Sequence, residues 1–337
     1  METQTNGAGA AATTTTSLPP VQPLPAAAAA PEPPQKEFFF ASVHPGQDKP
    51  LPDAYNSFCK AVLEYERVTE SPVWVIIQSD TSGQQIDSIS DGLADAIIDS
   101  ENQFSMDKKW TLLLHTLGGD PHAGYRIATF LQKATGGFDV VIPKMAKSAG
   151  TLISLAAWRI IMGKMSELGP LDMQVRDTES DLWDSALNET KSLQTLSREA
   201  LLLYAEKMEV LKNVCRGKKF ETKNRIATEF VNEMIKPLVE KIDAVHYTKM
   251  ARVMEIMKKY GRQLMRRAGY PAGKVNKVVE SLGDDFPDHS YIIDSREAYE
   301  LGLRVENPKP ELTGCVEHMA DFCGEITIVG RITSSLK

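Results

Sequence analysis

Residues 109–144, KWTLLLHTLGGDPHAGYRIATFLQKATGGFDVVIPK, decide the fold. An apolar run ends in a glycine pair, an amphipathic stretch closed by glycines follows, and a β-branched run completes the segment. This spacing predicts a strand over 109–119, a helix over 120–137 and a second strand over 138–144. Two strands joined by one helix of this length indicate a right-handed crossover between parallel strands.

The same alternation continues on both sides of this segment. Residues 51–70 have helical spacing and lead into an apolar run over 71–78, which we expect to be a buried strand. A helix of small residues begins at Ser148 and leads into a further strand over 159–164. The chain is therefore expected to adopt an α/β fold with a mostly parallel sheet, in which ligand chemistry gathers at the carboxyl ends of the strands.

The second half of the chain is mostly helical. Residues 190–282 show three-four periodicity and are expected to form a helical insert. Residues 294–306 combine a polar cap, an acidic first turn and a terminating glycine, which predicts a short helix that returns to a strand. We expect one domain over residues 37–310 and a C-terminal extension over 311–337, in which residues 324–332 form an edge strand.

The N-terminal residues 1–36 differ in composition from the rest of the chain. They are built largely from Ala, Thr, Pro and Gly, and their apolar surface is too small to offset the entropy of ordering, so we expect a disordered tail. The tail lacks the basic start and continuous apolar stretch of a secretory signal. No apolar run approaches the roughly 20 residues needed to cross a bilayer. We therefore expect a cytoplasmic protein without a transmembrane segment, and peripheral contact with a membrane stays open.

Charge and motif content narrow the choice of partners. The net charge of −7 over 337 residues argues against a general nucleic-acid binder. The four cysteines are expected to be free thiols. Cys315, His318 and Cys323 supply only three ligands at irregular spacing, so no metal site is expected. Because neither a GxGxxG after a strand nor a GxxxxGK phosphate loop occurs, we expect no nucleotide cofactor and no ATP site.

Two loops at the carboxyl edge of the expected sheet carry groups suited to acyl transfer. Gly118 and Gly119 follow a strand directly, and their N–H groups can turn toward a bound carbonyl oxygen. Ser148 begins a helix, where its hydroxyl lies in the positive field of the helix N-terminus and the N–H of Ala149 is another oxyanion donor. This pattern favours a serine nucleophile beside an oxyanion hole. The alternative is that Ser148 only caps the helix, a position that serine favours.

Four motifs occur in the order HTLGGDPHAG, KSAGTLISLAA, MSELGPLDMQ and DHSYIIDSREAYELGL. Together they resemble the serine dehydrogenase proteinase family of the Clp-protease/crotonase superfamily, which is related to signal peptide peptidase A. The resemblance runs from about residue 70 to 305 and implies a Clp/crotonase-like ββα superhelix and a peptidase-like hydrolase. Trp158, Arg159 and Met173 depart from the family pattern.

A serine nucleophile needs a base that takes its proton. In Clp-type peptidases the loop that matches the surroundings of His289 brings a catalytic aspartate toward the serine. Here a histidine stands in that loop, and Asp172 stands where the Clp-type histidine is expected. The resemblance therefore implies a triad in which His289 is the base for Ser148 and Asp172 orients it. Lys191 is the alternative base, because signal peptide peptidase relatives use a lysine.

Four further basic residues are candidates for the base. His115 lies inside an apolar strand and is expected to be a core histidine, whereas His122 follows the glycine pair and is expected on the substrate side. Lys147 directly precedes the serine and is expected to point away from it, and Lys144 lies at the start of the same turn.

Three functions compete on these grounds. The leading one is an ATP-independent serine peptidase-like hydrolase that cleaves a peptide or protein through an acyl-enzyme. A crotonase-type acyl-CoA enzyme would use the oxyanion donors without needing a serine at position 148. A non-catalytic oligomeric scaffold would keep the fold and recruit partners. In each case we expect a homo-oligomer, because superfamily members build sites near subunit contacts and residues 190–282 supply long amphipathic helices.

Overall fold

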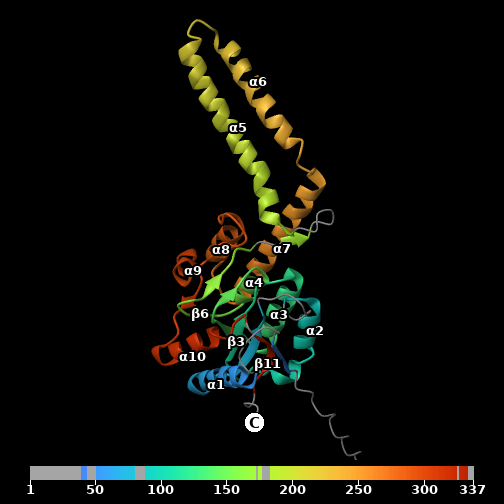
Figure 1. The fold of residues 1–337 in the computed structure, drawn as a ribbon, viewed down its shortest axis with the longest axis vertical. Helices are drawn as coiled ribbons and strands as arrows, with labels where there is room; N and C mark the ends of the chain where they lie inside the picture. Colours follow the sequence, from blue (N-terminus) through green and yellow to red (C-terminus); the bar gives the residue numbers. More distant parts are fainter. Residues whose placement is uncertain are drawn as a thin grey trace, which may run out of the picture. The chain divides into compact units, whose positions relative to one another are not determined.

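The computed structural model describes residues 39–43, 51–79, 88–171, 174–176, 183–324 and 326–332. The chain divides into two units, Met1–Lys36 and Glu37–Lys337, and every described residue belongs to the second (Figure 1). The predicted disorder of residues 1–36 and the position of Asp172 lie outside the described residues. Among the helices described, none combines the length and the apolar character needed to cross a membrane.

A seven-stranded sheet is the centre of the fold, with strand order β1-β11-β2-β3-β4-β6-β10. From β2 to β10 all neighbouring strands are parallel, whereas β11 is antiparallel to both β1 and β2. The strands of this sheet are β1 (Phe39–Val43), β2 (Val73–Ile77), β3 (Trp110–His115), β4 (Phe138–Ile142), β6 (Ile160–Met162), β10 (Val305–Glu306) and β11 (Ile326–Arg331). The predicted α/β class with a mostly parallel sheet is confirmed.

Helices cover both faces of this sheet. The described helices are α1 (Leu51–Thr69), α2 (Asp91–Ile98), α3 (Pro121–Ala134), α4 (Ala149–Ser154), α5 (Ala186–Val214), α6 (Phe220–Val239), α7 (Ala244–Arg267), α8 (Ala272–Asp284), α9 (Ser295–Leu301) and α10 (Pro310–Ala320). Of these, α5 and α6 extend away from the sheet (Figure 1). The helix predicted over 120–137 is α3, whose N-cap Asp120 accepts a hydrogen bond from the N–H of Ala123 at 2.8 Å. The short helix predicted over 294–306 is α9, and Gly302 ends it in the left-handed conformation.

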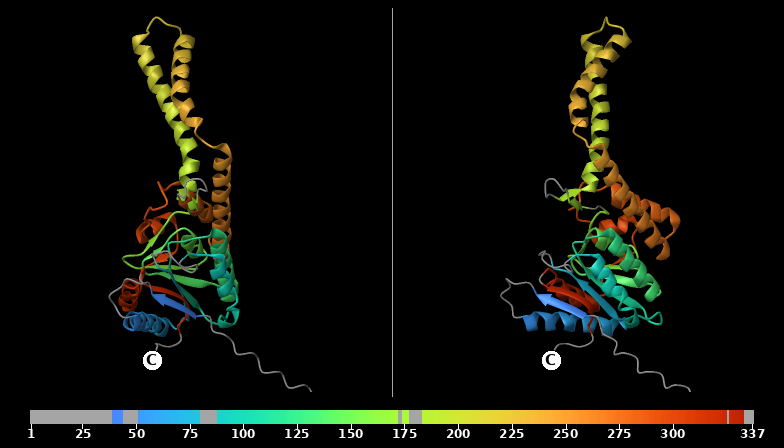
Figure 2. Two further views of the ribbon diagram at one scale, coloured as in Figure 1. Left: turned by 45° about the vertical axis from the view of Figure 1, so that its right-hand side comes forward. Right: turned by 90° about the vertical axis from the view of Figure 1, so that its right-hand side faces the viewer.

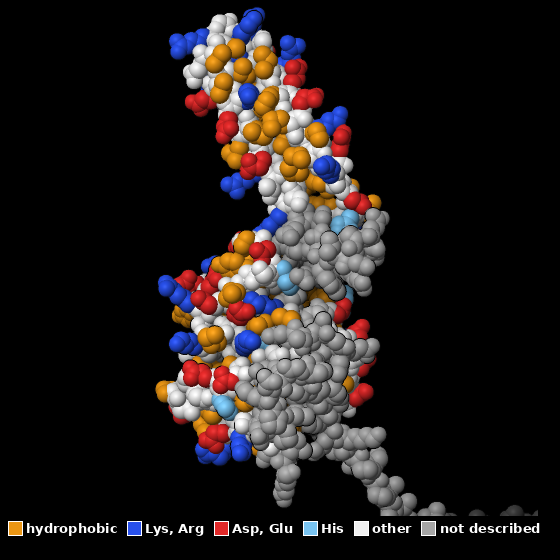
Figure 3. Space-filling view, viewed as in Figure 1, with side chains coloured by type: hydrophobic (Ala, Val, Ile, Leu, Met, Phe, Trp, Pro, Cys, Tyr) orange, Lys and Arg blue, Asp and Glu red, His pale blue; other side chains and the backbone are white. Residues whose placement is uncertain are grey.

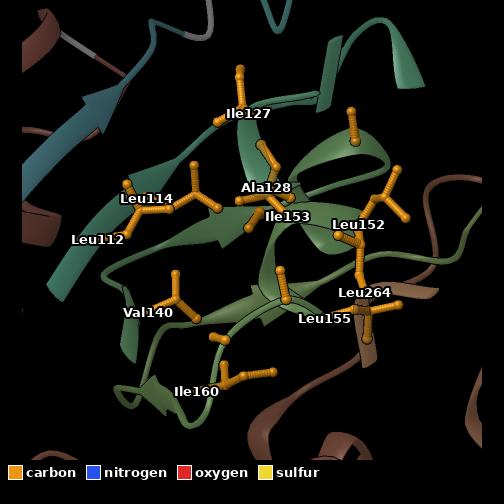
Figure 4. Packing of buried hydrophobic residues seen from close by; sticks show 14 of the residues in the cluster. Leu112, Leu114, Ile127, Ala128, Val140, Leu152, Ile153, Leu155, Ile160 and Leu264 are labelled. Atoms are coloured by element: carbon orange, nitrogen blue, oxygen red, sulfur yellow. The ribbon is translucent and has the colours of Figure 1, made fainter. Parts of the chain in front are cut away.

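The sheet separates two hydrophobic cores, because successive side chains of a strand point to opposite faces. On β2, Val73, Val75 and Ile77 pack with α1 and α10. Trp74 and Ile76 pack in the larger core with α2, α3, α4, α7 and α8 (Figure 2). Figure 4 shows part of this larger core, in which leucines of β3 meet α3 and α4. Each large apolar side chain buried in this way contributes about 1.5–3 kcal/mol to folding, so α4 is held firmly against the sheet.

The helical region contains a long hairpin of α5 and α6. Both helices pack on each other around a small apolar core of Met208, Leu211 and Ala227, and α5 also contacts α7 (Figures 1 and 2). Helices α7 and α8, in contrast, belong to the main core through residues such as Met257, Leu264 and Val279. The helices after α4 therefore divide into a part that builds the core and a part that extends away from it.

The strand predicted over residues 324–332 is present as β11, but the prediction that it lies at the edge of the sheet is wrong. β11 lies between β1 and β2, with Ile328 aligned to Ala41 on one side and to Ile77 on the other. Its residues Ile326 to Gly330 are buried, as is typical of a strand that is covered on both faces. Residues after 310 thus build part of the sheet and, through α10, part of one core.

Candidate active site

The loops that follow β3, β4 and β6 form a second, smaller ladder at the carboxyl edge of the sheet. Thr116 bridges Ala146 of β5 (Met145–Ala146), and β5 pairs in parallel with β7 (Glu167–Leu168). Leu168 in turn bridges Ile293, with N–H···O distances of 2.9 and 3.0 Å. This ladder brings together the glycine-pair loop, the approach to Ser148, the approach to Asp172 and the loop that contains His289.

Ser148 occupies the N-cap position of α4 without acting as a cap. Its backbone has φ 49° and ψ −111°, and its side chain makes no capping hydrogen bond in the described structure. The residue is 5% exposed. A non-glycine residue held at positive φ costs on the order of 1–3 kcal/mol, and such strain concentrates at functional sites. The capping alternative for Ser148 therefore has no geometric support.

Gly118 lies directly against this strained turn. It has φ 110°, and a Cβ atom at this position would lie 2.8 Å from Cβ of Ser148 and 2.9 Å from the carbonyl oxygen of Lys147. Gly119 has φ 142°, and a Cβ there would lie 2.3 Å from the carbonyl oxygen of Ile89. Only glycine satisfies both the dihedral angles and the space at these two positions. The glycine pair thus allows the loop after β3 to touch the serine.

The three amides expected to form an oxyanion hole differ in their present partners. The N–H of Gly118 donates to Oγ1 of Thr116 at 2.9 Å. The bridge between Gly119 and Ile89 uses the carbonyl of Gly118 and the N–H of Asp120, so it does not use the N–H of Gly119. Ala149 is the first residue of α4, and the N–H of a first helical residue has no acceptor within its own helix. In this structure Gly118 would have to leave Thr116 before its N–H could bind an oxyanion.

Thr116 is a residue of this site that sequence reasoning missed. Besides Gly118, its hydroxyl donates to Oε1 of the buried Gln78, and its backbone bonds to Met145 and Lys147 on either side of Ala146. A Cβ on Gly150 would lie 2.5 Å from Cγ2 of Thr116, so its methyl group packs under the start of α4. A threonine that ends a strand just before a glycine pair is the sequence signal that could have indicated this role.

Four of the basic candidates are engaged elsewhere. His115 is fully buried, and its Nδ1 accepts from the N–H of Met145 at 3.3 Å, which confirms the core histidine. Nζ of Lys144 donates to the carbonyl of Cys323 at 3.3 Å. His122 is exposed, and its Nδ1 lies 2.9 Å from the hydroxyl of Tyr260. Nζ of Lys147 lies among β7 and the loop after α8, which fits its expected direction away from the serine.

His289 and Lys191 are both associated with the loop that joins α8 to α9. His289 is half-buried in this loop, and Nζ of Lys191 on α5 donates to the carbonyl of Phe286 three residues earlier. The neighbouring Asp288 accepts from the N–H and the hydroxyl of Ser290 at 2.7 and 2.6 Å, and these bonds lower the pKa of its carboxyl group. Both candidate bases therefore contact or belong to one loop, which the ladder ties to β7.

The departures Trp158 and Arg159 lie at the opposite end of the strands. The indole of Trp158 covers Gly137, where a Cβ would lie 2.2 Å from the ring. Arg159 pairs with the buried carboxylate of Asp139 and with Glu306, and it precedes β6, whereas the loops around Ser148 follow the strands. These two substitutions leave the candidate site unchanged. Met173, like Asp172, lies outside the described residues.

Residues 93–248 match the family model of the ClpP-like SDH-type serine proteinases. This match supports the resemblance inferred from the four motifs. The matched range contains the glycine pair, Ser148, Asp172 and Lys191, and it ends before His289.

Individual relatives match shorter parts of the chain. Two uncharacterized proteins of Methanocaldococcus jannaschii are similar, one 36% identical over 104 residues and the other 44% identical over 64 residues. These matches cover 28% and 19% of this chain and 36% and 22% of the two relatives, so the chain spans about a third and about a fifth of their lengths. A point mutant of ClpP1 from Listeria monocytogenes superposes with a TM-score of 0.35 and 11% identity, covering 74% of this chain and 99% of that chain.

Proposed function

We propose that this chain is an ATP-independent serine peptidase-like hydrolase in which Oγ of Ser148 attacks a peptide carbonyl. One observation carries the proposal: Ser148 is held at φ 49° at the start of a helix that it does not cap. Backbone strain of this kind concentrates at functional sites, and the helix N-terminus favours the negative charge that develops when a nucleophile attacks there. The family match ends within the helical region, so the activity and the substrate of the whole chain are proposed here.

The proposed reaction uses the amides beside the serine. Oγ of Ser148 forms a bond to the carbonyl carbon while its proton passes to the base, and the carbonyl oxygen becomes an oxyanion. The N–H of Ala149 and an N–H of the Gly118–Gly119 pair would bind that oxyanion. The leaving amine takes the proton as its C–N bond breaks, and water then hydrolyses the acyl-enzyme by the reverse proton path.

His289 is the proposed base, and Asp172 is proposed to orient it. The support is positional: the loop of His289 is joined by Ile293 to β7, and the chain continues from β7 through Leu171 to Asp172. Lys191 remains the alternative base, because its amine reaches the same loop at Phe286.

Labelling with a fluorophosphonate tests the nucleophile. We expect the intact protein to be labelled at one serine and Ser148→Ala to lose both the label and any peptidase activity. Ser154→Ala is the matched control, because Ser154 is a buried serine of the same helix whose hydroxyl donates to the carbonyl of Gly150 at 2.8 Å. Equal labelling of Ser148→Ala and the control variant would refute the proposal.

The proposed setting is a cytoplasmic homo-oligomer that acts on peptides or proteins. None of the four cysteines, all within the described residues, forms a disulfide, which suits a reducing compartment. Figure 3 shows apolar side chains along the α5–α6 hairpin. Leu201 of α5 and Phe220 and Met234 of α6 are among the exposed large apolar residues. Exposed apolar surface of this extent is typical of interaction surfaces, and self-association would cover it.

A further inference from the structure

We propose that Lys147 is a positioning residue, which holds the strained Ser148 turn in register with the segments that lead to Asp172 and His289. This inference rests on the proposed function of Ser148. It assigns to the ammonium group of Lys147 a structural task at the site rather than proton transfer, and it explains why a lysine is placed next to the nucleophile yet directed away from it.

The contacts of Lys147 join three segments. Its Nζ donates to the carbonyl of Leu168 at 3.2 Å and to the carbonyl of Tyr291 at 3.3 Å, and it lies 3.3 Å from Oε1 of Glu167. Glu167 and Leu168 form β7, and Leu168 lies three residues before Leu171 and four before Asp172 in the chain. Tyr291 lies two residues after His289. One ammonium group therefore links the serine turn to both segments.

The surroundings make this link specific. Lys147 is 8% exposed, and a buried ammonium is tolerated only where acceptors replace its water. Its aliphatic stem packs closely against Gly169, where a Cβ would lie 2.8 Å from Cδ of Lys147. The Leu168 carbonyl also accepts from the N–H of Ile293, but the carbonyl of Tyr291 is held to this region by Lys147. Loss of the ammonium would release the part of the loop nearest His289.

The strain at Ser148 needs such a link. A residue at an unfavourable φ persists only where the surrounding structure over-determines its conformation. Gly118 closes one side of the Ser148 turn, and the backbone of Lys147 is bonded to Thr116 and Gly150 at 3.0 and 2.7 Å. The buried side chain of Lys147 ties the same turn to Leu168 and Tyr291. Without it the serine can relax and the base can move, and a displacement of about 1 Å costs roughly 100-fold in rate.

Labelling kinetics and hydrogen exchange test the inference. Lys147→Met keeps the stem and removes the charge, and Lys144→Met is the matched control from the same turn, whose Nζ contacts Cys323 instead. For Lys147→Met we expect the maximal rate of fluorophosphonate labelling to fall about 100-fold with an unchanged half-saturating probe concentration. Amide exchange in residues 286–293 should accelerate at least about tenfold. Lys147→Arg should recover most of the rate, and Lys144→Met should leave both readouts unchanged.

The outcomes separate this inference from the proposed function. If intact protein is not labelled but Lys147→Met accelerates exchange in residues 286–293, the proposed function fails and the positioning role stands. If intact protein is labelled while a folded Lys147→Met matches it in both rate and exchange, the positioning role is overturned. Failure of the arginine variant to restore the rate would also overturn it. If Lys147→Met does not fold, Glu167→Gln carries the same test, with about a tenfold slower labelling expected and an unchanged rate counting against the inference.

Discussion

Replacing Gly118 by alanine tests whether the close approach of the two loops matters. The added methyl group would lie 2.8 Å from Cβ of Ser148 and 2.9 Å from the carbonyl oxygen of Lys147, where ordinary contact begins at 3.4 Å. Both neighbours belong to rigid structure rather than to the end of a flexible side chain, so the loop and the serine turn must move apart.

The free-energy change has two parts. Alanine at φ 110° is strained whatever the space around it, at a cost of about 1–3 kcal/mol. Overpacking against Ser148 adds about 1–3 kcal/mol. We therefore expect Gly118→Ala to lower the free energy of unfolding by about 2–6 kcal/mol. A separation of roughly half an ångström or more at the serine should slow labelling by one to two orders of magnitude.

Gly136→Ala supplies the control for strain without contact. Gly136 has φ 68°, and among the described residues no heavy atom lies within 4 Å of the position that its Cβ would take, so only about 1 kcal/mol of destabilisation is expected. Urea unfolding and the rate of fluorophosphonate labelling measure the two effects. If Gly118→Ala loses no more stability than Gly136→Ala and is labelled at the normal rate, the proposed packing of the glycine loop on Ser148 is incorrect.

Further outcomes follow from other parts of the chain. His289→Ala should slow fluorophosphonate labelling by orders of magnitude while Lys191→Ala changes it little; the opposite result would favour the lysine as the base. The hydrogen bond from Arg262 lowers the pKa of Glu280, so its contribution to stability is present above the ordinary value of 4.5 and is lost as the pH falls through the lower folded value. The melting temperature of Glu280→Gln should therefore fall less on acidification than that of the unaltered chain. Deleting residues 1–36 should leave the melting temperature nearly unchanged, and a large drop would show that they dock. Light scattering should give a mass above that of the 37.2 kDa monomer, and a monomer at micromolar concentration would contradict the proposed assembly.

The parallel part of the sheet could be predicted because its signals are local. Apolar runs of strand length, glycine pairs and the amphipathic residues of α3 all lie within the segment that forms them. β11 was misplaced because its neighbours are distant: it pairs with β2 about 250 residues earlier, and no local pattern encodes such a partner. The small ladder of β5 and β7 was missed because two-residue strands have no detectable periodicity.

The candidate nucleophile was predictable for a similar reason. A serine between a strand and a small-residue helix is a local pattern, and four ordered motifs set it apart from an ordinary cap. The state of the Gly118 amide was not predictable, because its bond to Thr116 depends on the turn that the loop adopts. The hydrogen-bond partners of Lys147 could not be predicted either, because its acceptors lie 21 and 144 residues away in the chain.

The loop between α8 and α9 bears on the choice of base. Lys191 donates to the carbonyl of Phe286, and Lys147 donates to the carbonyl of Tyr291, so a lysine holds each end of the segment in which His289 lies. An amine that serves as an anchor keeps its protons on carbonyl oxygens, whereas a base must offer a lone pair to the serine hydroxyl. Under the histidine hypothesis both lysines do one task and His289 does another. Under the lysine hypothesis Lys191 must leave the carbonyl of Phe286 before it can act as a base. The loop would then lose this anchor during proton transfer from Ser148. We therefore keep His289 as the proposed base and propose that the two lysines support its loop.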